Sequence, residues 1–271
     1  MDKRLLFITI IITFLCIAAG CGKKAETSEI TVYAAASLTE TMEQIADNYK
    51  KENPGVNITF NFDSSGTLKT QIEEGADCDI FISAAKKQMD QLDITADKDK
   101  NKDGLDLIDP DTRTDLLENK VVLAVPEGNP KNINSYDDMD KGLREKNILF
   151  AMGNEDVPVG QYTQKILKYY GLDENELNEA GVITYCSNVK EVTSQIKEAA
   201  VDCGVIYSTD AFSAGLSVVD TATEEMCGKV IYPAAVLKAS KQQDEAKKFL
   251  EYLKTAESGK IFESVGFTLI K

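Results

Sequence analysis

Five short segments of the chain combine small residues with hydroxyl residues, and each lies between a strand-like stretch and a helix-like one. They are residues 34–39, 62–67, 157–161, 187–190 and 207–210. Where a helix begins, its first backbone N–H groups lack partners within the helix, and the helix dipole is positive there. Helix starts therefore bind anions, and serine or tyrosine hydroxyls add further donors. If several of these segments meet in one cleft, they predict an anion site that needs no basic side chain.

A simpler interpretation is that Ser37, Ser65 and Thr209 only cap their helices, which is the usual role of a hydroxyl residue at a helix start. For any single segment this interpretation is the stronger one. Five such segments spread over the chain are harder to explain by capping alone, so we expect several of them to share one binding site.

The elements that would position these segments alternate between strand and helix. Residues 30–34, 56–62 and 79–83 have strand patterns, and apolar residues at helical spacing follow the first two, giving β-α-β-α-β. This order predicts a parallel sheet flanked by helices, with ligands bound beyond the carboxyl ends of its strands. Strand patterns return at residues 121–125, 148–152, 182–185, 204–207 and 230–237. Two α/β units of about a hundred residues each predict two lobes.

The composition argues against several classes of function. The 271 residues include 45 acidic and 30 basic side chains, a net charge of −15, which disfavours nucleic acid and anionic membranes as partners. There is no histidine, the commonest general base and metal ligand. Ser65 as a nucleophile would lack a base, and no G-x-S-x-G motif occurs. We therefore expect a protein that is not an enzyme, needs no cofactor and coordinates no cation through its own side chains.

The first twenty residues are typical of a signal peptide. Two basic residues precede an uncharged run over residues 5–19, which is short for a membrane span. The sequence Ile17-Ala18-Ala19-Gly20-Cys21 that follows resembles a bacterial lipobox. This resemblance implies cleavage before Cys21, a lipid on its sulfur, a tether over residues 21–27, and an extracytoplasmic protein anchored to the cell membrane. The alternative is an ordinary secretory signal with an incidental cysteine.

Two further features of the sequence, the cysteines and a polar insertion, are weaker indications of a functional site. Four scattered cysteines have no metal or redox spacing, so buried free thiols are expected, although a disulfide stays open: Cys78, Cys186, Cys203 and Cys227. Within the polar insertion at residues 97–109, Asp99, Asn101, Asp103 and Gly104 match the start of an EF-hand calcium loop. Its twelfth position, which requires a bidentate carboxylate, is Pro110, so a solvated insertion is the better interpretation.

Several motifs together resemble the periplasmic molybdate-binding proteins of ABC transporters. The motifs, in the order and spacing of that family, are residues 34–39, 64–68, 71–76, 79–84, 157–160, 204–207 and 266–268. The resemblance covers nearly all of residues 29–271, with the 97–109 insertion and the anchor outside it. No single motif is specific, but the set is.

The resemblance implies an α/β fold of the periplasmic-binding-protein type II class, with two lobes, mainly parallel sheets flanked by helices, and a two-strand hinge. We place the crossing strands near residues 121–125 and 232–236. The first lobe is then expected at residues 28–122 and 234–271, and the second at residues 123–233. The family's ligand positions fall on residues of both lobes, with Ser37 and Ser65 in the first and Val159, Val189 and Tyr207 in the second. Val159 stands where the family often has alanine, which is tolerated if only its backbone binds.

A site made only of donors suits a fully deprotonated tetrahedral dianion such as molybdate, tungstate or sulfate, which can only accept hydrogen bonds. Hydrogen phosphate carries a proton, and leaving that proton unpaired costs about 1–3 kcal/mol. Asp63 departs from the small neutral residue that the family has beside the second-segment serines. A carboxylate in the cleft would repel a dianion or accept the proton of phosphate, whereas a helix cap, the interpretation we favour, would leave selectivity unchanged.

The sequence therefore predicts a monomeric receptor that binds molybdate or tungstate and delivers it to an ABC permease in the membrane. The first alternative keeps this fold and changes the ligand to phosphate or sulfate, with Asp63 as the residue that discriminates. A second alternative is a surface lipoprotein without a ligand, which would not respond to any anion.

Overall fold

The computed structural model describes residues 27–270. The predicted signal peptide, the predicted lipid attachment site Cys21 and all of the predicted tether except Thr27 lie outside the described residues, so those predictions stay predictions. Among the described residues, no helix has the length and apolar character needed to cross a membrane.

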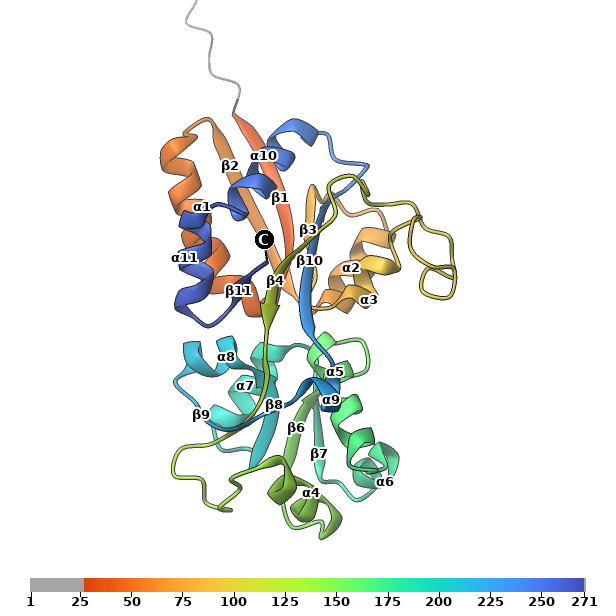
Figure 1. Cartoon of the computed structure of the whole chain (residues 1–271), viewed down its shortest axis with the longest axis vertical. Helices are drawn as coiled ribbons and strands as arrows, with labels where there is room; N and C mark the ends of the chain where they lie inside the picture. Colours follow the sequence, from red (N-terminus) through yellow and green to blue (C-terminus); the bar gives the residue numbers. More distant parts are fainter. Residues whose placement is uncertain (1–26, 271) are drawn as a thin grey trace, which may run out of the picture.

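The first lobe is built on a six-stranded sheet with the order β11-β4-β10-β3-β1-β2 (Figure 1). Its strands are β1 (Ser28–Ala35), β2 (Val56–Asp63), β3 (Ile80–Ile82), β4 (Thr114–Asn119), β10 (Val230–Val236) and β11 (Thr268–Leu269). Its helices are the short 3-10 turn η1 (Ala36–Leu38), α1 (Thr39–Glu52), α2 (Ser65–Glu73), α3 (Lys86–Asp90), α10 (Gln243–Leu253) and α11 (Ala256–Ser264). Helices α1, α10 and α11 pack together on one side of this sheet, and α2 and α3 lie on the other.

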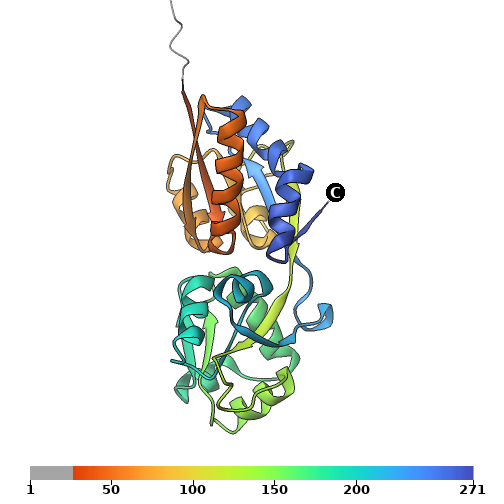
Figure 2. The same cartoon turned by 90° about the vertical axis from the view of Figure 1, so that its left-hand side faces the viewer.

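The second lobe has a five-stranded sheet with the order β7-β6-β8-β5-β9. Its strands are β5 (Val121–Val125), β6 (Phe150–Gly153), β7 (Ile183–Cys186), β8 (Cys203–Tyr207) and β9 (Ser217–Thr221). Its helices are α4 (Tyr136–Arg144), α5 (Pro158–Tyr169), α6 (Glu174–Glu179), α7 (Val189–Lys197), α8 (Ser208–Ala214) and α9 (Glu224–Cys227). Figure 2 shows the two lobes stacked end to end, with the connecting segments on one side.

The chain passes between the two sheets twice. Only Lys120 separates β4 of the first sheet from β5 of the second. The return runs through residues 222–229, which include α9, into β10 of the first sheet. By strand membership, both passages fall a few residues before the boundaries expected from the sequence: residues 121–125 belong wholly to the second sheet and residues 232–236 wholly to the first.

The two-lobed α/β architecture follows the sequence expectation, but the sheets are mixed and not mainly parallel. In the first sheet β1 pairs in parallel with β2 and β3, whereas β10 and β4 run antiparallel to their neighbours. In the second sheet β6 pairs in parallel with β7 and β8, whereas β5 runs antiparallel to β8 and β9. The antiparallel pairings all involve the strands that connect the lobes, β4, β5 and β10. Each lobe thus keeps a parallel β-α-β centre, whose strand ends carry the segments singled out above.

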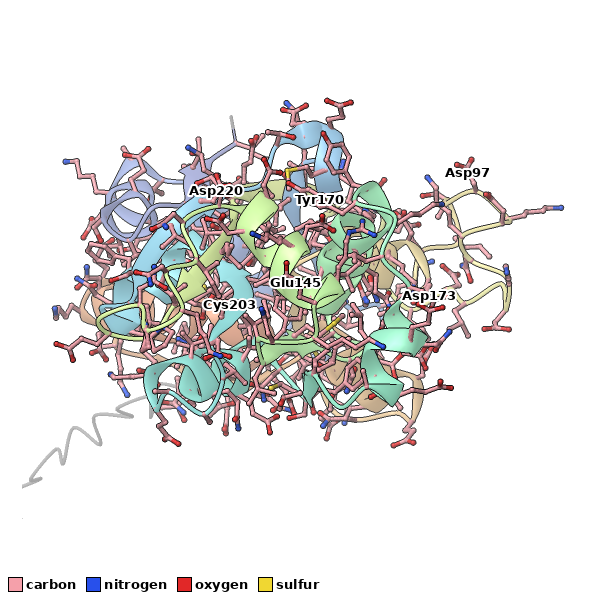
Figure 3. All side chains as sticks on the ribbon, turned by 90° about the horizontal axis from the view of Figure 1, so that it is seen from below. Asp97, Glu145, Tyr170, Asp173, Cys203 and Asp220 are labelled. Atoms are coloured by element: carbon pink, nitrogen blue, oxygen red, sulfur yellow. The ribbon has the colours of Figure 1, made fainter. Side chains whose placement is uncertain are left out.

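The polar insertion is a loop anchored at its base. Asp97 lies on this loop at one edge of the molecule (Figure 3). Arg113, just before β4, pairs with Asp93 and Asp90 beside it. The Asn101 side chain, one of the four EF-hand-like positions, is buried and bonds to the backbone of Asp93 and Leu105. Asn101 therefore holds the loop together, and its amide is already used within the protein.

The four cysteines of the described region are buried free thiols, as the default interpretation expected. Cys203, on β8 inside the second lobe, is 0% exposed (Figure 3). Burial raises the pKa of each of these thiols above its usual value, that of Cys186 to about 12 and those of Cys78 and Cys203 further. They are therefore protonated and unreactive at neutral pH.

Candidate functional site

A small cavity lies between the lobes, where the parallel strands end and the next helices begin. All five predicted ligand residues line it: Ser37, Ser65, Val159, Val189 and Tyr207. The remaining lining residues are Ala35, Ala36, Asp63, Ser64, Ala84, Val157 and Pro158. The space within it that the centre of a water-sized sphere can reach is about 10 Å³, far below the 300–1,000 Å³ typical of sites for organic ligands of drug size. The cavity suits a small inorganic ion.

Parallel pairing brings the first two segments side by side. In the register of β1 and β2, Ala34 lies opposite Phe62 and Ala35 opposite Asp63. The chain then turns into η1, which contains Ser37, and into α2, which begins at Ser65, so the two serines line the cavity from neighbouring strand ends. This arrangement follows from the β-α-β order, which places the carboxyl ends of both strands at one edge of the sheet.

The alternative that Ser37, Ser65 and Thr209 serve as helix caps is wrong. The cap of α2 is Ser64, whose Oγ accepts from the N–H of Thr67 at 3.1 Å. Ser37 lies inside η1, and the cap position of α8 is Tyr207, not Thr209. With Ser64 as the cap, the hydroxyl of Ser65, the first helical residue, is available for another role.

Ser65 makes a bond that fixes the direction of its own proton. The buried Oγ of Ser65 accepts from the backbone N–H of Ala84 at 2.9 Å. A backbone N–H can only donate, so the oxygen is the acceptor and the hydroxyl proton of Ser65 remains for a second partner. Because Ser65 lines the cavity, that proton is available to an acceptor placed there.

The second lobe contributes backbone donors from two helix starts. Pro158 is the first residue of α5 and has no N–H, so Val159 supplies that helix's first donor. Val189 is the first residue of α7, and the Asn188 side chain caps that helix by accepting from the N–H of Glu191. Across residues 27–270, no loop or side-chain hydrogen bond engages the N–H of Val159 or Val189. Both residues line the cavity, and their N–H groups lie at the positive ends of helices.

Tyr207 adds a phenol at the end of β8. Its hydroxyl is buried and has no hydrogen-bond partner among the described residues. An unpaired buried hydroxyl costs about 1–3 kcal/mol, which a ligand that accepts its proton would recover. Burial raises the pKa of Tyr207 well above its usual value, so the phenol stays a donor at neutral pH.

Asp63 is not the helix cap that the sequence favoured, because the next residue, Ser64, takes that position. Asp63 ends β2 and lines the cavity. Its Oδ1 accepts from the N–H of Ser64 at 2.7 Å and from the Asn188 side chain of the second lobe at 3.4 Å. A carboxylate thus stands at the cavity, but one of its oxygens is already held by donors from both lobes.

Other contacts show that the lobes are closed on each other. Lys190 of α7 pairs with Glu40 of α1, with Nζ–Oε distances of 2.8 and 2.9 Å. Gly66 at the start of α2 lies so close to the second lobe that an added Cβ would overlap the carbonyl oxygen of Asp156. These contacts bring the two lobes together beside the cavity.

Sequence reasoning missed a buried group of polar residues behind Ser37 and a basic groove beside the cavity. Ser37 Oγ lies 2.9 Å from the phenol oxygen of Tyr232, which in turn lies 3.3 Å from Asn119 Nδ2. Both partners are far from Ser37 in sequence, and no local pattern links them. The groove lies between α3 and α5 and its basic residues are Lys86, Lys87, Lys165, Lys168 and Lys229. In the part of the chain that the structure describes, no cluster of histidine, cysteine or carboxylate side chains could hold a metal ion.

The chain is similar to known proteins over almost its whole length. Residues 30–268 match the model of the bacterial extracellular solute-binding protein family. The chain is 34% identical to YvgL of Bacillus subtilis, provisionally described as an ABC transporter substrate-binding lipoprotein, over 98% of both chains. It is 33% identical to the molybdate-binding protein ModA of Escherichia coli, over 94% of this chain and 95% of that one.

Solved structures agree on the fold. The periplasmic molybdate-binding protein of Azotobacter vinelandii superposes with a TM-score of 0.73 at 22% identity, covering 89% of this chain and all of that one. At this identity the likeness concerns the fold alone, which is the two-lobed arrangement predicted from the sequence. The chain therefore belongs to the family of bacterial extracellular solute-binding proteins, together with the molybdate-binding protein ModA.

Proposed function

We propose that this protein is the extracytoplasmic receptor of an ABC import system and that it binds molybdate or tungstate in the cavity between its lobes. The observation that carries the proposal is the set of donors: the hydroxyl protons of Ser65 and Tyr207 and the N–H groups of Val159 and Val189 all have no acceptor among the described residues. Five residues with this chemistry surround one small cavity. The relationship to ModA supports the same ligand class.

The donor set explains why a dianion would be held without a basic residue. Each oxygen of molybdate carries negative charge and accepts hydrogen bonds, and hydrogen bonds to a charged group contribute about 1.5–3 kcal/mol each. The helix starts at Val159 and Val189 add their dipoles. Nothing is transferred or cleaved in this proposal, and the receptor works by binding and release.

The same proposal covers location and partners. Extracellular solute-binding proteins act outside the cytoplasm, and the lipoprotein description of YvgL supports a lipid on Cys21 of this chain. The receptor would act as a monomer and pass its ion to a membrane permease. Mass spectrometry of the membrane-extracted protein would show the mass of a diacylglyceryl group if Cys21 is lipidated, and the Cys21→Ala variant would be released from the membrane.

Calorimetric titration of the purified protein tests the ligand. We expect tight binding of molybdate and tungstate, weaker binding of sulfate and little binding of phosphate. A tight ligand at a hundred times its Kd stabilises the folded state by about 2.7 kcal/mol, which a thermal melt would detect. Equal affinity for all four ions, or no binding of any, would defeat the proposal.

Phosphate is the second candidate, because the Asp63 carboxylate lines the cavity and could accept its proton. The Asp63→Asn variant separates the two ligands, since asparagine keeps an oxygen for the Ser64 N–H and removes the charge. For a molybdate receptor we expect an affinity gain of about fivefold, because a nearby like charge disappears. For a phosphate receptor, the variant should instead lose phosphate binding. Glu198→Gln, an exposed charge change in the same protein, is the matched control and should alter neither affinity.

A further inference from the structure

A buried chain of hydrogen bonds connects the passage between the lobes to the cavity. Asn119, the last residue of β4, donates through Nδ2 to the phenol oxygen of Tyr232 on β10 at 3.3 Å. The same phenol oxygen lies 2.9 Å from Ser37 Oγ. All three side chains are buried, and Tyr232 is 0% exposed. The two strands that connect the lobes thus meet behind the serine that lines the cavity.

The orientation of the Asn119 amide is fixed by a backbone group. Its Oδ1 lies 2.8 Å from the backbone nitrogen of Lys120, and a backbone N–H can only donate. The oxygen must therefore be on that side, where the hydroxyl of Ser208 also donates to it at 3.0 Å. The amide nitrogen is then on the other side, toward Tyr232 and the hydroxyl of Thr209, so both of these oxygens accept from it.

This orientation determines where the next protons point. The Tyr232 oxygen accepts from Asn119, and its single proton has one further partner among the described residues, Ser37 Oγ. The opposite direction, with Ser37 donating to Tyr232, would leave the buried phenol proton unpaired, which is unfavourable. Ser37 Oγ therefore accepts from Tyr232, and the proton of Ser37 is directed to its remaining open side, the cavity.

We propose that Asn119 is a positioning residue for ligand selectivity: through Tyr232 it holds Ser37 as a hydrogen-bond donor toward the ligand. The proposal rests on the proposed function, and it deepens it. Ser65 is held as a donor in a similar way, because its Oγ accepts from the backbone N–H of Ala84. The cavity then favours ions that only accept, and it disfavours ions that carry a proton of their own, such as hydrogen phosphate.

The Asn119→Asp variant reverses this chain. A carboxylate at position 119 still accepts from Lys120 and Ser208 but can no longer donate to Tyr232. The Tyr232 phenol then donates to residue 119, and Ser37 donates to Tyr232, so Ser37 turns an acceptor toward the cavity. We expect molybdate affinity to fall by about tenfold or more, the usual effect of losing a buried hydrogen bond to a charged group. We also expect the ratio of molybdate to phosphate affinity to fall.

A second substitution separates the direction of the chain from the added charge. In the double variant Asn119→Asp with Tyr232→Phe the charge remains, but the link to Ser37 is cut and its proton is free to face the ligand. We expect molybdate affinity to return to within about threefold of the single Tyr232→Phe variant. Tyr232→Phe alone removes the group that holds Ser37 as a donor, so we expect it to lose part of its molybdate affinity, and it is the reference with which the double variant is compared.

Each result of these titrations decides the matter. If the unchanged protein binds molybdate and Asn119→Asp binds it with the same affinity, Asn119 does not have the proposed role, whereas the proposed function stands. If the double variant binds molybdate as weakly as Asn119→Asp does, the loss of affinity comes from the added charge, and this result also overturns the role of Asn119. A wild-type protein that binds no molybdate overturns the proposed function and this role with it. If thermal melts show that Asn119→Asp does not fold, Asn119→Leu takes its place, and an unchanged ratio of molybdate to phosphate affinity in that variant overturns the role of Asn119.

Discussion

Asp210 is a buried carboxylate whose charge the fold does not neutralise fully. It lies in the first turn of α8, is 1% exposed, and neither of its oxygens has a hydrogen-bond partner among the described residues. The nearest cation is the Lys190 ammonium, 3.5 Å from Oδ1. Burial raises the pKa of Asp210 from its ordinary value of 3.8 to about 6, and the proximity of Lys190 limits this rise. The charged form is therefore disfavoured in the folded protein.

This raised pKa predicts a loss of stability as the pH rises. Below about pH 4 the carboxyl is protonated in both the folded and the unfolded chain. Between the pKa of 3.8 in the unfolded chain and about 6 in the folded protein, only the folded chain keeps the proton. The stabilisation of the folded state by protonated Asp210 is therefore complete at low pH and is lost above the folded pKa. The free energy of unfolding falls by about 2–3 kcal/mol as a result.

The Asp210→Asn variant checks this dependence. Its free energy of unfolding, relative to the unchanged protein, should rise by about 2–3 kcal/mol between pH 4 and pH 7.5, measured by urea denaturation without ligand. An unpaired amide at this position changes the free energy of unfolding by the same amount at every pH. This contribution cancels when the differences at the two pH values are compared. The exposed Asp99→Asn variant should show no such rise. A difference that stays constant with pH would show that Asp210 does not titrate as described.

At the scale of elements, α1 and α7 hold the lobes together through one ion pair. Glu40 of α1 and Lys190 of α7 come from different lobes and meet at 2.8 Å. Both side chains are partly exposed, so the pair contributes about 0.2–1 kcal/mol to closure and less at high salt. Lys190 follows Val189 directly, so the pair lies beside the proposed anion site.

We expect the Glu40→Gln variant to release molybdate up to about fivefold faster at low salt, because the closed form loses this pair. The difference should disappear in concentrated salt, which screens exposed charges. Stopped-flow displacement of bound molybdate by excess tungstate measures the rate. Glu43→Gln, an exposed glutamate on the same helix, is the control for the change in net charge. Equal release rates for both variants would show that the pair does not stabilise closure.

The elements also show what sequence could and could not predict. Hydroxyl residues at the starts of helices, together with the β-α-β order, predicted that several such segments share one edge of the sheet, whereas the choice of Ser37 and Ser65 as ligand residues came from the family resemblance. The roles of Tyr232 and Asn119 depend on contacts between β4, β10 and η1. Asn119 and Tyr232 are 113 residues apart in sequence, and Ser37 and Tyr232 are 195 residues apart. No local pattern predicts such contacts. The cap assignment of Asp63 failed because two adjacent residues suit the same position, and packing selected Ser64.

For the whole molecule, a net charge of −15 opposes the approach of an anion, yet the cavity lies beside a groove lined by lysines. Ala84 lines the cavity and Ala85 the groove, while α5 contributes Val159 to the cavity and Lys165 to the groove. Lys86 and Lys229 form ion pairs with acidic side chains, whereas Lys87 and Lys168 form none within residues 27–270. The groove therefore presents positive charge at the side of the cavity.

We expect the Lys87→Gln, Lys168→Gln double variant to bind molybdate several times more slowly at low salt, with an unchanged dissociation rate, because exposed charges act mainly on encounter. Raising the salt concentration should narrow the difference. The matched control is Lys141→Gln with Lys146→Gln, two exposed lysines within and just after α4, the helix at the far end of the second lobe in Figure 1. A control variant that slows association equally would assign the effect to net charge and not to the groove.

Closure of the whole molecule depends on the absence of a side chain at Gly66. A Cβ at this position would overlap the carbonyl oxygen of Asp156 in the opposite lobe, and a backbone atom cannot move aside as a side-chain end can. Within α2 alone, alanine is a better helix former than glycine by about 1 kcal/mol. The Gly66→Ala variant should therefore be at least as stable as the unchanged protein without ligand, yet unable to close fully.

Incomplete closure separates Val159 and Val189 from Ser37 and Ser65, because the first pair comes from one lobe and the second from the other. We expect Gly66→Ala to lose at least about tenfold in molybdate affinity, as a protein does when its binding-competent form is rarely populated. Small-angle X-ray scattering with saturating molybdate should show a larger radius of gyration than the unchanged protein gives. Gly55→Ala, whose added Cβ meets nothing within 4 Å, is the control and should bind and close normally. Normal affinity in Gly66→Ala would mean that the anion is held without the lobe contact that this structure shows.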